Sequence, residues 1–301
     1  MPQVHYNACP VCGSTQIRPV FLAKDYTVSG EVFPIEECSA CTLRFTQDVP
    51  DQESIGPYYK SEDYISHSNT RKGLVSRMYQ AVRTRTMQQK AAIVERYTGK
   101  KTGRLLDLGC GTGTFLNTMK SRGWEVAGLE PDADARAMAK QLYHLEIAPS
   151  HEIYQLAEAQ FDAVTLWHVL EHVHELHEYM DQLKQLLKPA GVLLIAVPNY
   201  TSRDAAIYEQ YWAAYDVPRH LYHFSPKAME VLTARHGLRI RKLLPMWFDS
   251  FYVSLLSSKY KYGSTHYIGA GLHGVSSNIN AAGNTRECSS VIYVIRKEQE
   301  I

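Results

Sequence analysis

The part of the chain between residues 100 and 245 alternates short apolar runs with longer segments whose apolar residues recur at helical spacing. The runs predict strands at 104–108, 125–130, 161–167 and 192–197, a weaker strand near 144–148, and closing strands near 238–246 and 289–296. The intervening segments predict helices at 113–122, 132–143, 174–188 and 226–236. Repeated strand–helix units predict an α/β fold, a Rossmann-like doubly wound sheet of seven strands, with ligands at the carboxyl ends of the strands.

The flanking segments differ in composition from this core. We expect a small zinc-ribbon-like module at residues 1–48. We expect a connector followed by one or two helices at residues 49–100. The main domain then covers 101–301. Within it, Lys261 to Thr285 is rich in Gly, Ser, Asn and Ala, which predicts a mobile loop. With short helices expected near Phe251 to Tyr260, this loop forms a mobile insertion at about 250–287.

Charge and hydropathy exclude some classes of partner. The 301 residues include 32 basic and 31 acidic side chains, and no basic run forms the electrostatic footprint of a nucleic-acid-binding protein. The longest apolar stretch, Val192 to Pro198, is too short to span a bilayer. The N-terminus has no apolar signal segment. A cytoplasmic protein with a small-molecule substrate and no membrane partner is therefore expected, and its oligomeric state stays open.

Four of the six cysteines form two Cys-x-x-Cys pairs, Cys9 with Cys12 and Cys38 with Cys41, separated by 25 residues. Two such pairs in a cytosolic chain indicate a tetrahedral zinc site. Four thiolates leave no open coordination position, so the zinc is expected to be structural. Two redox dithiols and accidental pairing are the alternatives. A module of this size buries little core, which favours dependence on a metal.

A glycine-rich turn follows the first strand of the main domain. Asp107 precedes Gly109, Gly111 and Gly113, and Glu130 ends the next strand. Such a turn lets the backbone approach a cofactor closely, and a carboxylate on the next strand can accept hydrogen bonds from ribose hydroxyls. The dinucleotide fingerprint would need further glycines, but the chain has Thr114 and Leu116 at those positions. The pattern therefore argues against NAD.

The Asp-x-Gly-x-Gly-x-Gly spacing resembles motif I of the class I S-adenosylmethionine-dependent methyltransferases. The resemblance implies that Asp107 organises the loop around the methionine portion and that Glu130 binds the ribose. The residues expected to contact the cofactor are Asp107, Gly109, Cys110, Gly111, Gly113, Glu130, Pro131 and His168.

The fourth strand leads into His168-x-x-Glu171-His172, whose spacing matches inverted zinc proteases. A peptidase needs this motif on a long helix, whereas here it follows an apolar strand directly. The segment resembles the same region of the ubiquinone-biosynthesis O-methyltransferase group, which implies that His168 faces the cofactor's methyl group and makes His172 a further catalytic candidate. Some relatives hold a divalent cation here through acidic residues; His168 occupies the first such position, so metal-assisted catalysis stays open. Structurally, Glu171 and His172 could instead fix a turn.

A loop rich in aromatic and basic residues contains Asp216-x-Pro-Arg219-His220-Leu-x-His223. It resembles a stretch of bacterial methyltransferases linked to surface-glycan and sugar chemistry. His220 is a candidate general base because the unperturbed histidine pKa lies near neutrality. The structural alternative is a network that orders the loop, favoured for Asp216 and His223.

These observations together predict methyl transfer from S-adenosylmethionine to a small-molecule hydroxyl, possibly related to sugars or surface glycans. One alternative is C-methylation of a nucleotide-linked sugar, because such enzymes share a paired-cysteine N-terminal domain. The other is a non-catalytic interaction protein that keeps the zinc module and the cofactor fold. A measurement of S-adenosylmethionine binding distinguishes the two kinds of enzyme from an interaction protein that no longer binds the cofactor.

Overall fold

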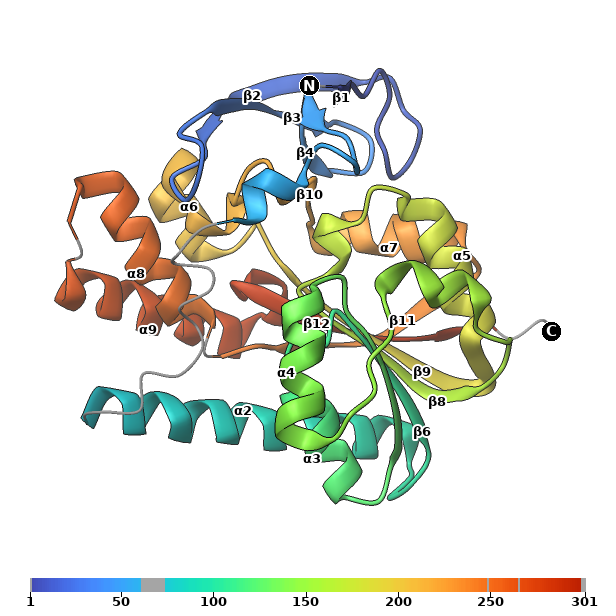
Figure 1. Cartoon of the computed structure of the whole chain (residues 1–301). Coiled ribbons are helices and arrows are strands. Elements are labelled where there is room, and N and C mark those ends of the chain that lie inside the picture. Colours follow the sequence, from blue (N-terminus) through green and yellow to red (C-terminus); the bar gives the residue numbers. More distant parts are fainter. Residues whose placement is uncertain (1, 61–73, 248, 265, 299–301) are drawn as a thin grey trace.

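The computed structural model describes residues 2–60, 74–247, 249–264 and 266–298 (Figure 1). Its main sheet has six strands in the order β11-β12-β9-β8-β6-β7. They are β6 (Arg104–Leu108), β7 (Glu125–Leu129), β8 (Phe161–Trp167), β9 (Leu187–Pro198), β11 (Leu238–Pro245) and β12 (Ser290–Lys297). β7, β6, β8 and β9 run parallel, while β12 is antiparallel to both β9 and β11. The predicted α/β class is confirmed.

The expected seventh strand near 144–148 does not form within the described residues. Ala148 makes only an isolated parallel bridge to Leu129, and the chain then enters the 3₁₀ helix Ser150–Gln155. Pro149 follows the bridge directly. Because proline has no backbone N–H to donate to a ladder, the pairing stops there.

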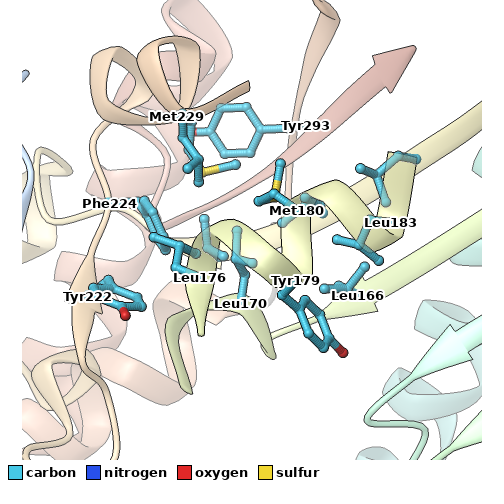
Figure 2. Packing of buried hydrophobic residues seen from close by; sticks show 14 of the residues in the cluster. Leu166, Leu170, Leu176, Tyr179, Met180, Leu183, Tyr222, Phe224, Met229 and Tyr293 are labelled. Carbon is cyan, nitrogen blue, oxygen red and sulfur yellow. The ribbon is translucent and has the colours of Figure 1, made fainter. Parts of the chain in front are cut away.

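Helices cover both faces of the main sheet because neighbouring strand residues point to opposite sides. One face carries residues such as Leu105 and Ala163 against α2 (Leu74–Thr98) and α3 (Thr114–Ser121). The other face packs on α5 (Leu176–Leu186) and α7 (Pro226–Arg235). Figure 2 shows Leu166, Met180 and Tyr293 within this second layer. This two-sided burial makes the sheet doubly wound.

The N-terminal module is built around an antiparallel sheet that the main domain completes. Its own strands are β2 (Ile17–Lys24), β3 (Val32–Cys38) and β4 (Arg44–Thr46), and β1 (Gln3–Val4) pairs separately with β5 (Val49–Pro50). The fourth strand of the larger sheet, β10 (Tyr222–His223), comes from the aromatic loop of the main domain. The module therefore shares backbone hydrogen bonds with the segment that carries His220.

The insertion before β12 is helical, so the prediction of a loop at 261–285 is wrong for the described residues. α8 (Asp249–Tyr262) packs against α9 (Tyr267–Gly283), with the short α6 (Arg203–Tyr208) beside them (Figure 1). A Cβ on Gly274 would lie 2.7 Å from Cδ1 of Phe251. The small residues of α9 therefore permit α8 and α9 to pack closely. This tertiary contact overrides the weak helix propensity of those residues.

The remaining helices are α4 (Ala133–Tyr143) and short 3₁₀ segments. The 3₁₀ segments are Gly56–Tyr59, Leu170–His172, Glu209–Tyr211, Ala213–Tyr215 and Thr285–Glu287. Over the described ranges, no helix combines the length and the apolarity needed to cross a membrane.

A buried arginine joins the N-terminal module to the main domain. The Arg219 guanidinium donates to Asp216 at 2.6 and 3.0 Å and to Asp25 of the module at 3.0 Å, and it also reaches the Tyr58 carbonyl at 2.8 Å. Only 1% of the Arg219 side chain is exposed. Its loss would leave two carboxylates without their counter-charge.

Replacing Arg219 with methionine is therefore expected to lower the free energy of unfolding by about 3 kcal/mol, since the removal of one partner strands the buried charge of the other. Urea denaturation measures this loss. The matched control is Arg18→Met, which breaks an ion pair to Glu37 whose arginine is 61% exposed, with an expected loss below about 1 kcal/mol. Equal losses in the two variants would contradict this role for Arg219.

Candidate active site

The glycine loop after β6 adopts a backbone that requires glycine. Gly109, Gly111 and Gly113 have φ values of 62°, 53° and 75°. A Cβ on Gly109 would lie 2.5 Å from Cγ2 of Val169, whereas a Cβ on Gly111 would meet no atom within 4 Å. The loop is thus packed tightly on one side and open above Gly111, where a ligand can approach the backbone.

Glu130 directly follows β7 and faces this loop. Its Oε2 accepts from the Gly111 N–H at 2.8 Å, and its Oε1 accepts from the Asp132 N–H at 3.0 Å. Burial raises the pKa of Glu130, while these two N–H donors oppose the rise. Of the other predicted cofactor contacts, Cys110 in the glycine loop is half-buried, and Pro131, which follows Glu130, is exposed. A buried carboxylate beside an open backbone turn fits the predicted ribose-binding role.

Asp107 lies beneath the loop rather than on its surface. It is 2% exposed, and Thr165 Oγ1 donates to its Oδ1 at 2.6 Å. Burial raises the pKa of Asp107 to about 7, against the lowering effects of Thr165 and the Lys90 charge. Lys90 of α2 lies 4.4 Å from the centre of the Trp167 ring. Sequence reasoning missed Lys90, because no pattern connects α2 with the strand edge.

His168 is held between two carboxylates directly after β8. Its φ of 59° is unusual for a residue other than glycine. Nε2 lies 2.8 Å from Asp249 Oδ2, and Nδ1 lies 3.4 Å from Glu171 Oε1. Burial alone would lower the pKa of His168, but Asp249 and Glu171 outweigh it and raise the pKa to about 10. His168 is thus an imidazolium near neutral pH, which excludes it as a general base there.

A second cluster joins Glu171, His172 and His220, whose side chains come within 4.8 Å of one another through one nitrogen or oxygen each. His172 Nδ1 donates to the Arg219 carbonyl at 3.0 Å, and His220 Nδ1 donates to the Ala214 carbonyl at 2.8 Å. Burial and the nearby His220 lower the pKa of His172 to about 4. The structure therefore brings together two predicted catalytic histidines that lie far apart in the sequence.

A sequence profile described as a methyltransferase domain matches residues 79–243, more than half of the chain. The chain belongs to this methyltransferase domain family. The matched segment contains the glycine loop, Glu130 and all three histidines of the site. The protein is thus an S-adenosylmethionine-dependent methyltransferase with a class I domain.

The chain is also similar to several curated proteins and solved structures. The chain is 32% identical over 143 residues to a ubiquinone biosynthesis O-methyltransferase of Maricaulis maris, covering 44% of this chain and 56% of that protein. The corresponding human mitochondrial protein is 26% identical over 165 residues, covering 49% of this chain and 44% of that protein. The chain thus spans about half the length of the curated relatives it matches. A geranyl diphosphate C-methyltransferase of Streptomyces coelicolor A3(2) shares the fold, with a TM-score of 0.51, 14% identity and coverage of 77% of this chain and 88% of that one.

Within the methyltransferase domain, the spacing that resembled a zinc protease has a different setting. His168 directly follows β8, and Glu171 and His172 lie in the three-residue 3₁₀ segment Leu170–His172. A peptidase of this type needs the motif on a long helix. In the aromatic loop, Arg219 donates to Asp216. Thr46 Oγ1 lies 3.0 Å from His223 Nε2 and donates to the His220 carbonyl at 2.7 Å.

The two cysteine pairs converge in the N-terminal module. Sγ of Cys9 lies 3.4 Å from Sγ of Cys41, and Sγ of Cys12 lies 3.5 Å from Sγ of Cys38. All four sulfurs lie within 4.8 Å of one another. Each contact joins one pair to the other, as expected when four thiolates surround one ion.

Two further residues contact the histidines of the site. Asp249, at the start of α8, is the ion-pair partner of His168. Tyr59 lies in the segment predicted as a connector, and its hydroxyl is 3.1 Å from His172 Nδ1. Both contacts join segments remote in sequence, so spacing alone carries no signal for them.

His168 is expected to stay protonated up to about pH 10, and Asp249→Asn should move its pKa down towards the usual histidine value. NMR titration of the imidazole measures both pKa values. The pKa of His168 is higher in the folded state than in the unfolded state, so the charged imidazole stabilises the folded protein. This stabilisation is fully present below about pH 6.5 and is lost as the pH rises through about 10. Asp181→Asn is the control, since Asp181 contacts His236. An unchanged His168 pKa in Asp249→Asn would refute the pairing.

Proposed function

We propose that this protein transfers the methyl group of S-adenosylmethionine to a hydroxyl of a small-molecule acceptor. The observation that carries the proposal is the joint position of Glu130 and the histidines. Glu130 faces the open glycine loop at the carboxyl end of β7, and His168 begins the His168–His172 segment at the carboxyl end of β8. Since β6 lies between these parallel strands, both groups lie at the same edge of the sheet.

The residues present fit the cofactor. Glu130 offers a carboxylate to the ribose hydroxyls, and at Gly111 the loop offers a backbone with no atom within 4 Å of the place that a Cβ would take. Asp107 holds the loop from below through Thr165. When bound, the cofactor supplies an electrophilic methyl group on a sulfonium, so the protein's task is to position the acceptor and remove its proton.

His172 and His220 suit proton removal by their geometry. In both side chains Nδ1 donates to a backbone carbonyl, which leaves the lone pair of Nε2 as the one that can accept a proton. A lone pair of this kind accepts a proton from a hydroxyl, and His168 adds positive charge beside the forming oxyanion. In this proposal His168, which was expected to face the methyl group, acts as a cation, and His172 joins His220 as a candidate proton acceptor.

C-methylation of a nucleotide-linked sugar is the second candidate. The convergence of Cys9, Cys12, Cys38 and Cys41 favours it, because those enzymes share a paired-cysteine N-terminal domain. We propose that these thiolates hold a structural zinc ion in either case.

Calorimetry with S-adenosylmethionine, followed by a screen with methyl-labelled cofactor over phenols, sugars and nucleotide sugars, tests the proposal. Binding followed by label on an acceptor oxygen supports O-methylation. Label on carbon would select the second candidate. A chain that binds no S-adenosylmethionine would be a non-catalytic relative, and the proposal would fail.

A further inference from the structure

A threonine of the N-terminal module contacts the loop that carries His220. Thr46 ends β4, which lies beside β10 (Figure 1), and it is fully buried. Its backbone N–H donates to the Leu221 carbonyl at 2.9 Å, and its hydroxyl donates to the His220 carbonyl at 2.7 Å. One residue of the module therefore binds two consecutive carbonyls of the main domain.

A buried histidine fixes the direction of the Thr46 hydroxyl. His223 Nε2 lies 3.0 Å from Thr46 Oγ1, and a hydroxyl has only one proton to donate. Because that proton goes to the His220 carbonyl, Oγ1 accepts from His223, whose Nε2 therefore carries a proton. Burial, together with the charges of His220 and Arg44, lowers the pKa of His223 well below its ordinary value, so His223 is neutral. A directed chain of hydrogen bonds thus runs from His223 through Thr46 to His220.

The other hydrogen bonds of His220 come from the main domain. Its N–H donates to the Asp216 carbonyl at 3.1 Å, and its Nδ1 donates to the Ala214 carbonyl at 2.8 Å. Thr46 binds the remaining backbone group of His220, the carbonyl. Since Nε2 is the ring atom whose lone pair can accept a proton, the position of this backbone decides where that lone pair points. The module therefore helps to aim the His220 ring.

A second contact of the module acts on the residue beside His220. Asp25 accepts from the Arg219 guanidinium at 3.0 Å, and the same guanidinium donates to both carboxylate oxygens of Asp216. Asp216 Oδ2 lies 4.0 Å from His220 Nε2. A carboxylate at this distance favours the imidazolium that forms when His220 accepts a proton. The module thus supports both the proton acceptor and its counter-charge.

We propose that Thr46 is a positioning residue for His220, so that the N-terminal module forms part of the acceptor site. The hydroxyl of Thr46 holds the His220 carbonyl, the held backbone aims Nε2, and Nε2 takes the proton of the acceptor hydroxyl. The last of these steps rests on the proposed function. The effect of Thr46 on the His220 ring does not depend on it.

The tautomers of two histidines test the hydrogen-bond chain in the wild-type protein. The full-length chain is labelled with isotope-enriched histidine, and the nitrogen chemical shifts are read at a pH where both rings are neutral. We expect the proton on Nδ1 in His220 and on Nε2 in His223; the signals lost in His220→Gln and His223→Gln assign them. A His223 proton on Nδ1 would overturn the proposal, because Thr46 would then donate its hydroxyl proton to His223 instead of the His220 carbonyl.

Thr46→Val removes the hydroxyl and keeps the branched shape of the side chain. We expect the His220 ring to populate both tautomers in this variant. The kcat for transfer of labelled methyl to the acceptor that the screen selects should fall by up to about 100-fold, since a displacement of about 1 Å far from the reacting atoms costs that much. The dissociation constant of S-adenosylmethionine should not change. Thr46→Ser, which keeps a hydroxyl, should recover most of the lost rate.

Thr42→Val is the matched control, because Thr42 Oγ1 makes a similar contact across the same boundary, 2.7 Å from Ser225 Oγ at the start of α7. Its kcat and its His220 spectrum should match those of wild type. The signal of His236, which contacts Asp181, reports whether each variant is folded.

A single His220 tautomer in folded Thr46→Val, or equal kcat values in Thr46→Val and Thr42→Val, would overturn the positioning role. Calorimetry with S-adenosylmethionine keeps the two proposals apart. A wild-type chain that binds no cofactor, but whose His220 tautomer changes in Thr46→Val, would refute methyl transfer and leave the positioning of His220 intact.

Discussion

Replacing Glu130 with alanine is expected to abolish measurable binding of S-adenosylmethionine. The carboxylate would accept two hydrogen bonds from the ribose, and hydrogen bonds to a charged group contribute roughly 1.5–3 kcal/mol each. Affinity should therefore fall by roughly 100- to 10,000-fold. The substitution also leaves the Gly111 N–H without its present acceptor, which loosens the loop that the cofactor needs. Isothermal titration calorimetry measures the dissociation constants.

Glu125→Ala is the matched control for this experiment. Glu125 begins the same strand, β7, but its side chain is 70% exposed and pairs with Arg104 at the far end from the loop. We expect the affinity of Glu125→Ala to stay close to that of wild type. If the two variants bound S-adenosylmethionine equally well, Glu130 would not be the ribose ligand.

Replacing Cys38 with serine is expected to remove one equivalent of zinc and to unfold the N-terminal module. Structural zinc contributes roughly 10–16 kcal/mol of apparent binding free energy in small domains that fold around it. The module keeps some support from the pairing of β4 with β10 and from Arg219. We therefore expect residues 2–48 to become accessible to protease. The free energy of unfolding of the main domain should fall by several kcal/mol, which is less than the binding free energy of the zinc ion.

Native mass spectrometry gives the zinc content, and limited proteolysis followed by urea denaturation gives the structural consequence. Cys288→Ala is the control, because Cys288 is a buried cysteine outside the cluster and should leave the zinc content unchanged. If Cys38→Ser kept the full zinc content of wild type, the four cysteines would not form a metal site.

The local signals in the sequence were reliable where neighbouring residues decide the structure. Gly109, Gly111 and Gly113 need positive φ whatever surrounds them, and the position of Glu130 after an apolar strand follows from the βα repeat. The start of α7 is equally local, since Ser225 caps the Ala228 N–H and Pro226 occupies the first turn. The same kind of reasoning failed at 261–285, because small residues that disfavour an isolated helix permit close packing between α8 and α9.

The sequence by itself thus determined the α/β class, the cofactor loop with its carboxylate and the two cysteine pairs, because each depends on periodicity or short spacing. Only the tertiary structure decided which charges meet. It brought Asp249 to His168, Arg219 to Asp25, and His220 to Glu171 and His172, across segments that no spacing rule connects. These contacts shift the pKa values of His168 and His172 in opposite directions, because the pKa of a buried group depends on its neighbours in space. Which histidine is charged is therefore a property of the fold.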